Sequence, residues 1–304
     1  MKEFKRAEDI AILKHGPKSI NFMLKNIKLG DFMPKKKSVW YHELSWPEIV
    51  QKSKECDIIL LPVGSIEMHG PHCPTGSDSL NAQGIAERVA EKTGTIVASP
   101  FWYGPEMYMQ HGFPGSIPVR SDVVKQFAKD VISGLIKNGF KKVIVLNGHG
   151  QQWVYVGALH ELALETKAFI AVATWWELIR KTINETCETP MVHAGEVETS
   201  LALELYPDLV DMNKADKESA PSTVNKRWFG GPTGYPEEGG FPGHNITCSY
   251  FQVDTYRLGI LGDATKATKE KGKKMVDAVV NKLSEFIEEL KAKYPPGVSP
   301  LEKY

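Results

Sequence analysis

The 304-residue sequence has few cysteines, no excess of either charge, and no long run of apolar residues. Its four cysteines form no Cys-x-x-Cys pair, which argues against a disulfide scaffold and favours reduced thiols. Basic and acidic residues number 37 each, so no overall field draws the chain to nucleic acid or a membrane. The apolar stretches are too short for a signal peptide or a membrane span. These absences predict a cytoplasmic protein with a small-molecule ligand.

The apolar sequence that is present suffices for one large core, since 42% of the residues are hydrophobic and 24% are charged. Residues 1–37 mix lysine, glycine and proline without a regular pattern, and we interpret them as an N-terminal extension. Regular patterning starts after them and continues without an obvious linker. We therefore predict that residues 38–304 form a single domain.

Short apolar runs alternate with amphipathic segments along this domain. Strands are predicted at residues 58–63, 95–99, 142–146 and 169–174, and helices from about residue 45 and over 80–92, 121–139, 152–166 and 263–294. In the helix that we expect Ser121 to cap, one buried face is predicted to hold Val124, Phe127, Ala128, Val131 and Leu135. Alternation of strand and helix predicts an α/β fold, with a mainly parallel sheet covered by helices on both faces.

Acid and imidazole groups follow two of these strands. Glu67 and His69 come after strand 58–63, and side chains two residues apart in an extended segment can point the same way. Asp78 can fold back towards them as the next helix begins, and His149 follows strand 142–146. Because the carboxyl ends of parallel strands meet at one edge of a sheet, these groups are expected to converge.

A further candidate is a glutamate in the segment from His193 to Ser200, which contains Glu196 and Glu198. Taken singly, a histidine after a strand is usually structural, and an acid at a helix start is usually a cap. Taken together, buried charges at one edge are costly unless a cation neutralises them. Carboxylates and imidazoles are suitable ligands for divalent metals, so the pattern indicates a metal site.

Ordered motifs in the sequence resemble those of the creatininase family of metal-dependent amidohydrolases. They are Glu67-Met68-His69-Gly70, Gly76-Ser77-Asp78, Asn147-Gly148-His149-Gly150, and His193-Ala194-Gly195 with Glu198-Thr199-Ser200. The resemblance covers about residues 39–294. It implies a three-layer α/β/α domain, usually assembled as a homohexamer, with two divalent metals in a cavity at the carboxyl edge of the sheet.

The resemblance also implies a set of metal ligands. Glu67 is expected on one ion, His69 and His149 on the other, and Asp78 between them. Creatininase has a glutamate two residues after the histidine that matches His149, whereas this chain has Gln151 there. A neutral amide is a poorer ligand for a hard cation. Either Glu198 completes the site, or the site is weaker, or one ion suffices. We expect one or two ions per subunit, with Zn²⁺ favoured and Mn²⁺ or Fe²⁺ as alternatives.

Hydrolysis by metal-activated water is the chemistry that follows from this resemblance. His193 matches the family's proton shuttle, with a structural histidine as the alternative, and Glu198 is expected to be the second catalytic residue. Trp176 matches one of the two lid tryptophans of creatininase, but Thr189 stands at the position of the other. Val192 stands where creatininase has an acid directly before the proton shuttle. Creatinine is therefore not the expected substrate.

The expected reaction is ring opening of a small cyclic polar substrate, either a cyclic amide or a keto-cyclitol such as a diketo-inositol in inositol catabolism. His111, Gln151 and Trp176 are predicted to bind it, and residues 228–243 are predicted to form a lid. One alternative is an amidohydrolase that acts on a formamide or a peptide in cofactor biosynthesis. Another is an inactive relative that serves as a binding or assembly protein.

Overall fold

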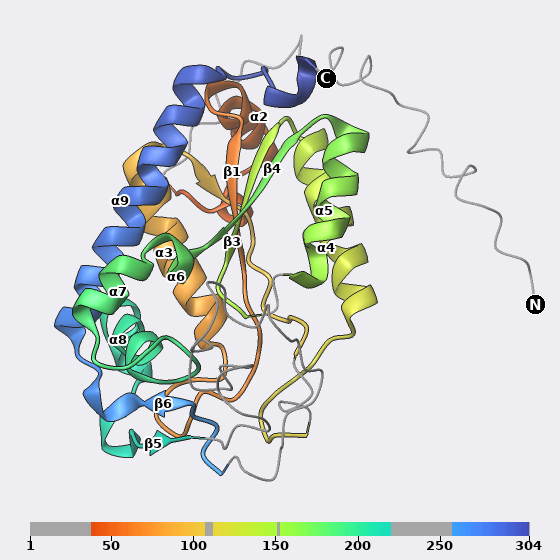
Figure 1. Cartoon of the computed structure of the whole chain (residues 1–304). Coiled ribbons are helices and arrows are strands. Elements are labelled where there is room, and N and C mark those ends of the chain that lie inside the picture. Colours follow the sequence, from red (N-terminus) through yellow and green to blue (C-terminus); the bar gives the residue numbers. More distant parts are fainter. Residues whose placement is uncertain (1–37, 107–111, 151–152, 220–256, 304) are drawn as a thin grey trace, which may run out of the picture.

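The computed structural model describes residues 38–106, 112–150, 153–219 and 257–303 (Figure 1). Predictions for residues 1–37, the loop 228–243, His111 and Gln151 fall outside these ranges. No helix in the described part of the chain has the length and apolar character needed to cross a membrane.

A parallel sheet of four strands, in the order β2-β1-β3-β4, lies at the centre. The strands are β1 (Ile58–Val63), β2 (Ile96–Val97), β3 (Lys142–Asn147) and β4 (Phe169–Thr174). Val63 pairs with Asn147 and Asn147 pairs with Thr174, so three strands end at the same level. The chain runs outwards from β1 to β2 and then in the opposite direction from β3 to β4. The strand order thus reverses between β1 and β3, and we call the region beyond the ends of these two strands the crevice, because ligands bind there in such sheets.

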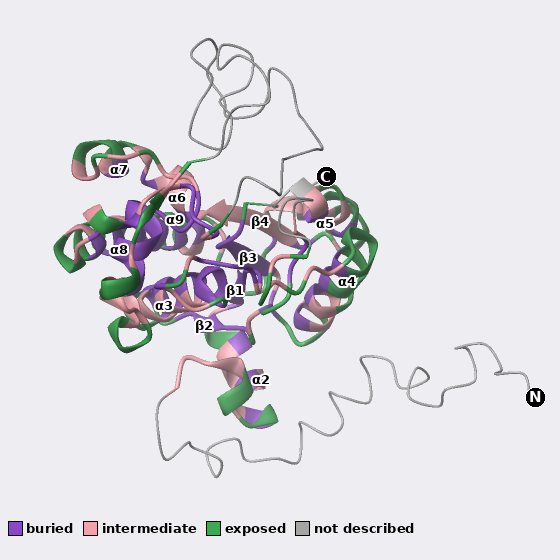
Figure 2. Cartoon of the chain, turned by 90° about the horizontal axis from the view of Figure 1, so that it is seen from below, coloured by how far each residue is buried: buried purple, intermediate pink, exposed green. Residues whose placement is uncertain are grey.

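Strand β1 is buried on both faces, because its successive residues enter different cores. Ile58 and Leu60 belong to one apolar cluster, whereas Ile59, Leu61 and Val63 belong to the other. This arrangement explains why the predicted strands are continuous apolar runs rather than alternating ones. In Figure 2 the strands β1, β2 and β3 are buried between the helices, whereas β4 is half-buried.

The two faces are covered by different helices (Figure 1). One core is formed with α3 (Ser77–Thr93), α6 (Trp175–Leu178), α7 (Arg180–Thr186), α8 (Glu196–Leu205) and α9 (Lys269–Lys293). The other is formed with α4 (Ser121–Lys137) and α5 (Trp153–Thr166), and α2 (Trp46–Glu55) contributes Ile49 to it. The three-layer α/β/α fold is thus confirmed.

The remaining elements are short. They are the 3₁₀ helices η4 (Tyr41–Glu43), η6 (Pro207–Leu209), η7 (Met212–Lys214), η10 (Ala264–Lys266) and η11 (Pro300–Lys303), and the antiparallel pair β5 (Lys217–Glu218) and β6 (Gly262–Asp263). Because β6 and η10 occupy the start of the helix predicted from residue 263, that helix begins later, at Lys269. Thr268 caps that helix, because its side chain accepts a hydrogen bond from the Lys271 backbone N–H.

Two details of α4 differ from the prediction. The helix begins at Ser121 itself, and Arg120 occupies the N-cap position. Phe127 is 51% exposed, and Ile132 takes part in the core instead, because residues 124, 128, 132 and 135 share the inward face. Phe127 lies at the rim of that face, with its ring centroid 4.6 Å from that of Phe101.

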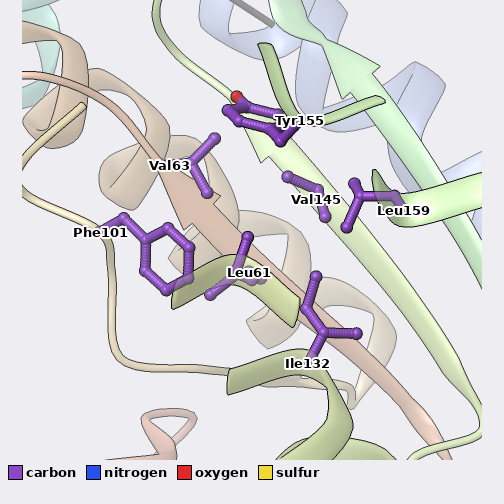
Figure 3. A pocket seen from close by; sticks show the side chains of 8 residues that line it. Leu61, Val63, Phe101, Ile132, Val145, Tyr155 and Leu159 are labelled. Atoms are coloured by element: carbon purple, nitrogen blue, oxygen red, sulfur yellow. The ribbon is translucent and has the colours of Figure 1, made fainter. Parts of the chain in front are cut away.

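A small apolar hollow lies in the core between the sheet and the α4–α5 layer (Figure 3). Side chains of Leu61, Val145 and Leu159 are among those that line it, and it has no room for a water molecule. Its walls carry no charged group, so this hollow is a packing feature of the core and not a ligand site.

Candidate metal centre

The crevice beyond β1 and β3 collects acidic and imidazole side chains from three segments. Glu67 and His69 lie in the loop after β1, Asp78 lies in the first turn of α3, and His149 follows β3. All four are buried. The end of β3 approaches α3 so closely that a Cβ at Gly148 would overlap the Asp78 carbonyl oxygen. A glycine is therefore required here for His149 to reach Asp78.

His149 is held between hydrogen-bond acceptors. Its Nδ1 lies 2.8 Å from Asp78 Oδ2 and 3.7 Å from Glu67 Oε2, and its Nε2 lies 2.7 Å from the Pro105 carbonyl oxygen. Burial lowers the pKa of this imidazole, but Glu67 and Asp78 outweigh burial and raise the pKa to about 9. In the metal-free protein His149 is therefore a buried imidazolium.

His69 occupies the other side of Asp78. Its Nε2 lies 3.3 Å from Asp78 Oδ1 and 3.7 Å from Glu198 Oε2, yet within the described residues this buried nitrogen makes no regular hydrogen bond. Burial lowers the pKa of His69, whereas Asp78, Glu198 and Glu67 raise it to about 10. A buried imidazole nitrogen that faces two carboxylates without bonding to either fits a cation between them.

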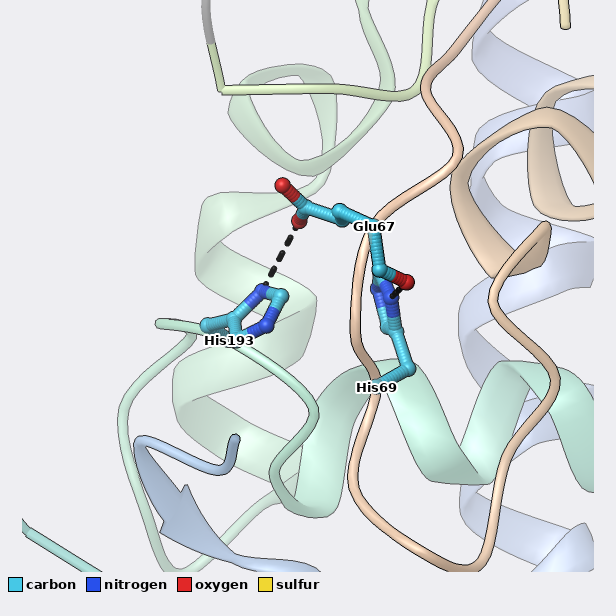
Figure 4. Close-up of side chains that lie close together, drawn as sticks. All are labelled: Glu67, His69 and His193. Atoms are coloured by element: carbon cyan, nitrogen blue, oxygen red, sulfur yellow. Dashed lines mark hydrogen bonds and ion pairs between the residues drawn. The ribbon is translucent and has the colours of Figure 1, made fainter. Parts of the chain in front are cut away.

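His193 packs against His69, with ring centroids 4.6 Å apart (Figure 4). Its Nδ1 lies 3.1 Å from Glu67 Oε1, and its Nε2 lies 2.7 Å from the Met68 carbonyl oxygen. Burial lowers the pKa of His193, and the Glu67 carboxylate raises it by more. The same carboxylate has a pKa below its ordinary value, because His149 and His193 together outweigh its burial.

Glu198 enters the site from the first turn of α8. Ala194 holds a left-handed backbone with φ of 50°, and its N–H donates to Glu198 Oε2 over 2.5 Å. Such a conformation is strained for a residue other than glycine, and strain of this kind clusters at functional sites. Burial raises the pKa of Glu198, an effect that His69 and His193 only partly offset.

The neighbouring Glu196 has a different role. Its carboxylate accepts hydrogen bonds from the backbone N–H groups of Glu188 and Thr189, and it pairs with Lys271 at 2.5 Å. None of these partners belongs to the acid–imidazole cluster, and the contacts anchor the loop before α8. Of the two glutamates left open by the sequence, Glu198 is thus the one at the site.

Glu106 also belongs to the cluster, although it is absent from the residues predicted from the sequence. It lies in the loop after β2, where the Ser65 hydroxyl donates to its Oε1. Burial and the charge of Glu67 raise the pKa of Glu106 to about 12. A glycine followed by an acid after a strand, Gly104-Pro105-Glu106, repeats the pattern seen after β1 and was the available indication.

In the described ranges of the chain, the ligand-type atoms form three overlapping groups within which all atoms lie within 4.8 Å of one another. These groups are Glu67–Glu106–His149, His69–Asp78–Glu198 and Glu67–His69–His193. Oxygen and imidazole nitrogen at such separations are a donor set that suits zinc, manganese or iron. The residues present therefore fit divalent metal ions.

Comparison with known proteins identifies the family. The creatininase family, described as creatinine amidohydrolase, matches residues 42–287. The chain belongs to the creatininase family. It is 36% identical over 282 residues to the 3-dehydro-scyllo-inosose hydrolase of Thermotoga maritima, with 88% of each chain covered. It is 27% identical over 282 residues to the creatinine amidohydrolase of Pseudomonas putida, which covers 86% of this chain and 99% of that protein.

Solved creatininase structures share the fold. The manganese form, "Creatininase Mn", superimposes with a TM-score of 0.68 at 25% identity, covering 86% of this chain and all of that one. The family resemblance inferred from the motifs is therefore confirmed, and the protein is a divergent creatininase-family hydrolase.

The predicted substrate-binding residues do not join the cluster in the same way. His111 and Gln151 lie outside the described residues. Trp176 is half-buried, packs against the core that contains α9, and stands edge-on to Trp175 with ring centroids 5.4 Å apart. No hydrogen bond or ring contact links Trp176 to the acid–imidazole cluster within the described ranges. Its role in substrate binding stays a prediction.

Proposed function

We propose that this creatininase-family hydrolase is metal-dependent and opens the ring of a polyhydroxylated cyclic diketone. The observation that carries the proposal is its 36% identity, over 88% of both chains, to a protein named as a hydrolase of such a ring. The identity to a creatinine amidohydrolase is lower, at 27%. The substitutions at Thr189 and Val192 also disfavour a creatinine pocket.

Two divalent ions per subunit suit the geometry, with zinc first and manganese or iron as alternatives. Glu67 and His149 would hold one ion, and His69 and Glu198 the other. Asp78 would bridge them, because its Oδ2 faces His149 and its Oδ1 faces His69. This grouping differs from the one that the resemblance implied, in which His69 and His149 share an ion. Glu198 would take the place of the missing glutamate at Gln151.

A bound divalent cation lowers the pKa of water from about 16 to about 7 and polarises a carbonyl group. The side chains around the crevice supply the proton transfers. Glu198, whose pKa is raised, is suited to accept a proton from the attacking water at Oε1 or Oε2. His193 faces two acceptors and so holds a proton on both ring nitrogens, one of which it can deliver to the leaving atom.

Ring opening balances with one water molecule. In a ring with two carbonyl groups separated by one carbon, water adds to the first carbonyl carbon and the bond from it to the intervening carbon breaks. The electron pair is delocalised onto the second carbonyl, and His193 returns a proton to the intervening carbon. The product is an open-chain keto acid. Hydrolysis of a cyclic amide would need the same proton transfer, with nitrogen as the leaving atom.

The remaining predictions belong with this proposal. Trp176, His111 and Gln151 would bind the substrate, and a homohexamer in the cytoplasm is expected from the family. An inactive binding or assembly protein is disfavoured, because such a protein has no need of His193 beside a full set of ligands.

The test uses full-length protein purified without chelator. Metal content is measured by inductively coupled plasma mass spectrometry, and hydrolysis of 3-dehydro-scyllo-inosose, creatinine and a formylated amine is followed by proton NMR. We expect close to two metal equivalents and turnover of the diketo ring well above the other two. Less than half an equivalent, together with unchanged thermal stability in His69→Ala, would rule out the metal-dependent hydrolase. Faster turnover of creatinine than of the diketo ring would show that the substrate class is a cyclic amide and not a cyclic diketone.

A further inference from the structure

The loop after β2 is pressed against the loop after β1. A Cβ at Gly104 would lie 2.5 Å from the Gly64 carbonyl oxygen, so only glycine allows this approach. The contact brings Glu106 alongside the segment that carries Glu67. The Val119 N–H donates to the Gly104 carbonyl oxygen over 3.0 Å and fixes the loop from its other side. The position of Glu106 is thus set by backbone packing.

The Glu106 carboxyl group is only half satisfied. Its Oε1 accepts the Ser65 hydroxyl, but its Oε2 is buried and has no hydrogen-bond partner among the described residues. The carboxyl group lies within 4.8 Å of ligand atoms of Glu67 and His149. Two carboxyl groups this close and this buried need a shared proton or a cation between them.

The balance of charge favours a metal cation, rather than a shared proton, between Glu67 and Glu106. Glu67, Asp78 and Glu198 supply three negative charges, and histidines that bind metal are neutral. Two divalent ions carry four positive charges and the doubly protonated His193 carries a fifth, so three carboxylates leave two positive charges buried in the crevice. A fourth carboxylate removes one of them, and within the described residues Glu106 is the remaining acid grouped with these ligands.

We propose that Glu106 is a fourth carboxylate ligand of the metal centre and gives an oxygen to the ion held by Glu67 and His149. This inference rests on the proposed metal-dependent function and adds a ligand to it.

The rival role for Glu106 is that of a neutral acid that shares a proton with Glu67. Glu106→Gln separates the two roles, since an amide can still donate a hydrogen bond to Glu67 but is a poor ligand. Glu106→Asp keeps the charge and withdraws the oxygen by one methylene group. Glu204→Gln is the matched control, because Glu204 is a partly buried carboxylate on α8 that pairs with Arg88 at 3.1 Å, outside the cluster.

Chelator-treated full-length protein is titrated with Zn²⁺ against a chromophoric competing chelator. We expect wild type and Glu204→Gln to bind two ions, and Glu106→Gln to bind one of them at least about tenfold more weakly. Glu106→Asp should weaken the same ion. If Glu106→Gln binds two ions with wild-type affinity, the inference is overturned. If Glu106→Gln does not fold, two ions of wild-type affinity in Glu106→Asp overturn it. Failure of wild type to bind zinc would instead overturn the proposed function.

Discussion

His193 and Glu67 form an ion pair across the crevice, with Nδ1 3.1 Å from Oε1, while His193 Nε2 faces the Met68 carbonyl oxygen at 2.7 Å. Neither a carboxylate nor a carbonyl oxygen can donate, so both ring nitrogens carry protons. The pair thus holds a proton beside the predicted metal ligands, on a segment that is separate from the strands.

His193→Gln is predicted to reduce kcat by a factor of about 10² to 10⁴, the usual contribution of a general acid, while metal content stays at the wild-type level. Metal analysis and steady-state kinetics on the same preparation measure both. His160→Gln is the control, because His160 is exposed on α5 and should leave both values unchanged. Loss of an ion in His193→Gln would show that His193 is a ligand rather than a proton donor.

The metal-free protein is predicted to lose stability as the pH rises from 6.5 to 9. His69 and His149 have pKa values raised from 6.5 to about 10 and about 9, so the folded state binds more protons than the unfolded state in this window. Stability from these groups is fully present below pH 6.5 and is lost as the pH rises through the folded pKa values. Melting temperatures of chelator-treated protein across this range measure the effect.

The zinc-loaded protein is the comparison, and it should show the opposite slope. Metal binding displaces protons from the histidines, so a higher pH strengthens binding and stabilises the folded state. The window starts at pH 6.5 because burial lowers the pKa of His72 to about 4, and that group changes stability only below pH 6.5. Parallel slopes with and without zinc would contradict the assignment of these histidines as ligands.

Gly148→Ala is predicted to weaken metal binding, because the new methyl group would overlap the Asp78 carbonyl oxygen and lies 3.1 Å from the Ala82 Cβ. Either α3 or His149 must then move. Gly134→Ala in α4 is the matched control: a Cβ there meets nothing within 4 Å, and the helix should gain about 0.5–1 kcal/mol. Zinc titration and urea unfolding of both variants test this contrast. Wild-type zinc affinity in Gly148→Ala would show that the close approach is dispensable.

Strong periodic patterns predicted most of the fold. Strands β1 and β4 match their predicted bounds, and β3 is one residue longer. The apolar runs of β1 and β3 are continuous because these strands are buried on both faces of the sheet, whereas β4 is half-buried along its whole length. Strand β2 is shorter than predicted. At this edge the Val97 N–H donates to the Val39 carbonyl oxygen and the Ala98 N–H donates to that of Leu60, after which the chain turns away. Pairing at an edge depends on tertiary partners that local sequence does not reveal.

The candidate site was predictable where a ligand follows a strand, as for Glu67, His69 and His149. Glu106 was not, because its place depends on the contact between Gly104 and Gly64, which are 40 residues apart in the sequence. The grouping of His149 with Glu67 was not predictable either. It depends on the direction of each side chain around Asp78, and strand order alone does not fix that direction.

A buried ion pair lies at the end of the sheet opposite to the candidate metal centre. Lys142, at the first position of β3, is fully buried, and its Nζ lies 2.6 Å from Asp57 Oδ1. Asp57 Oδ2 also accepts the Gly297 N–H at 3.0 Å, so the pair ties the C-terminal segment to the sheet. Ile58, the first residue of β1, is in register with Lys142, whereas the metal ligands follow the last residues of the strands.

Lys142→Met is predicted to destabilise the protein by about 3–5 kcal/mol, because it leaves the Asp57 carboxylate buried without a counter-charge. The free energy of unfolding from urea titration measures the loss, and zinc binding should stay at the wild-type level since the pair lies at the far end of the sheet. The double variant Asp57→Asn with Lys142→Met removes both charges and keeps an acceptor for Gly297, so it should recover much of the lost stability. A double variant as unstable as Lys142→Met would mean that packing of the lysine stem, and not the uncompensated charge, is what the substitution removes.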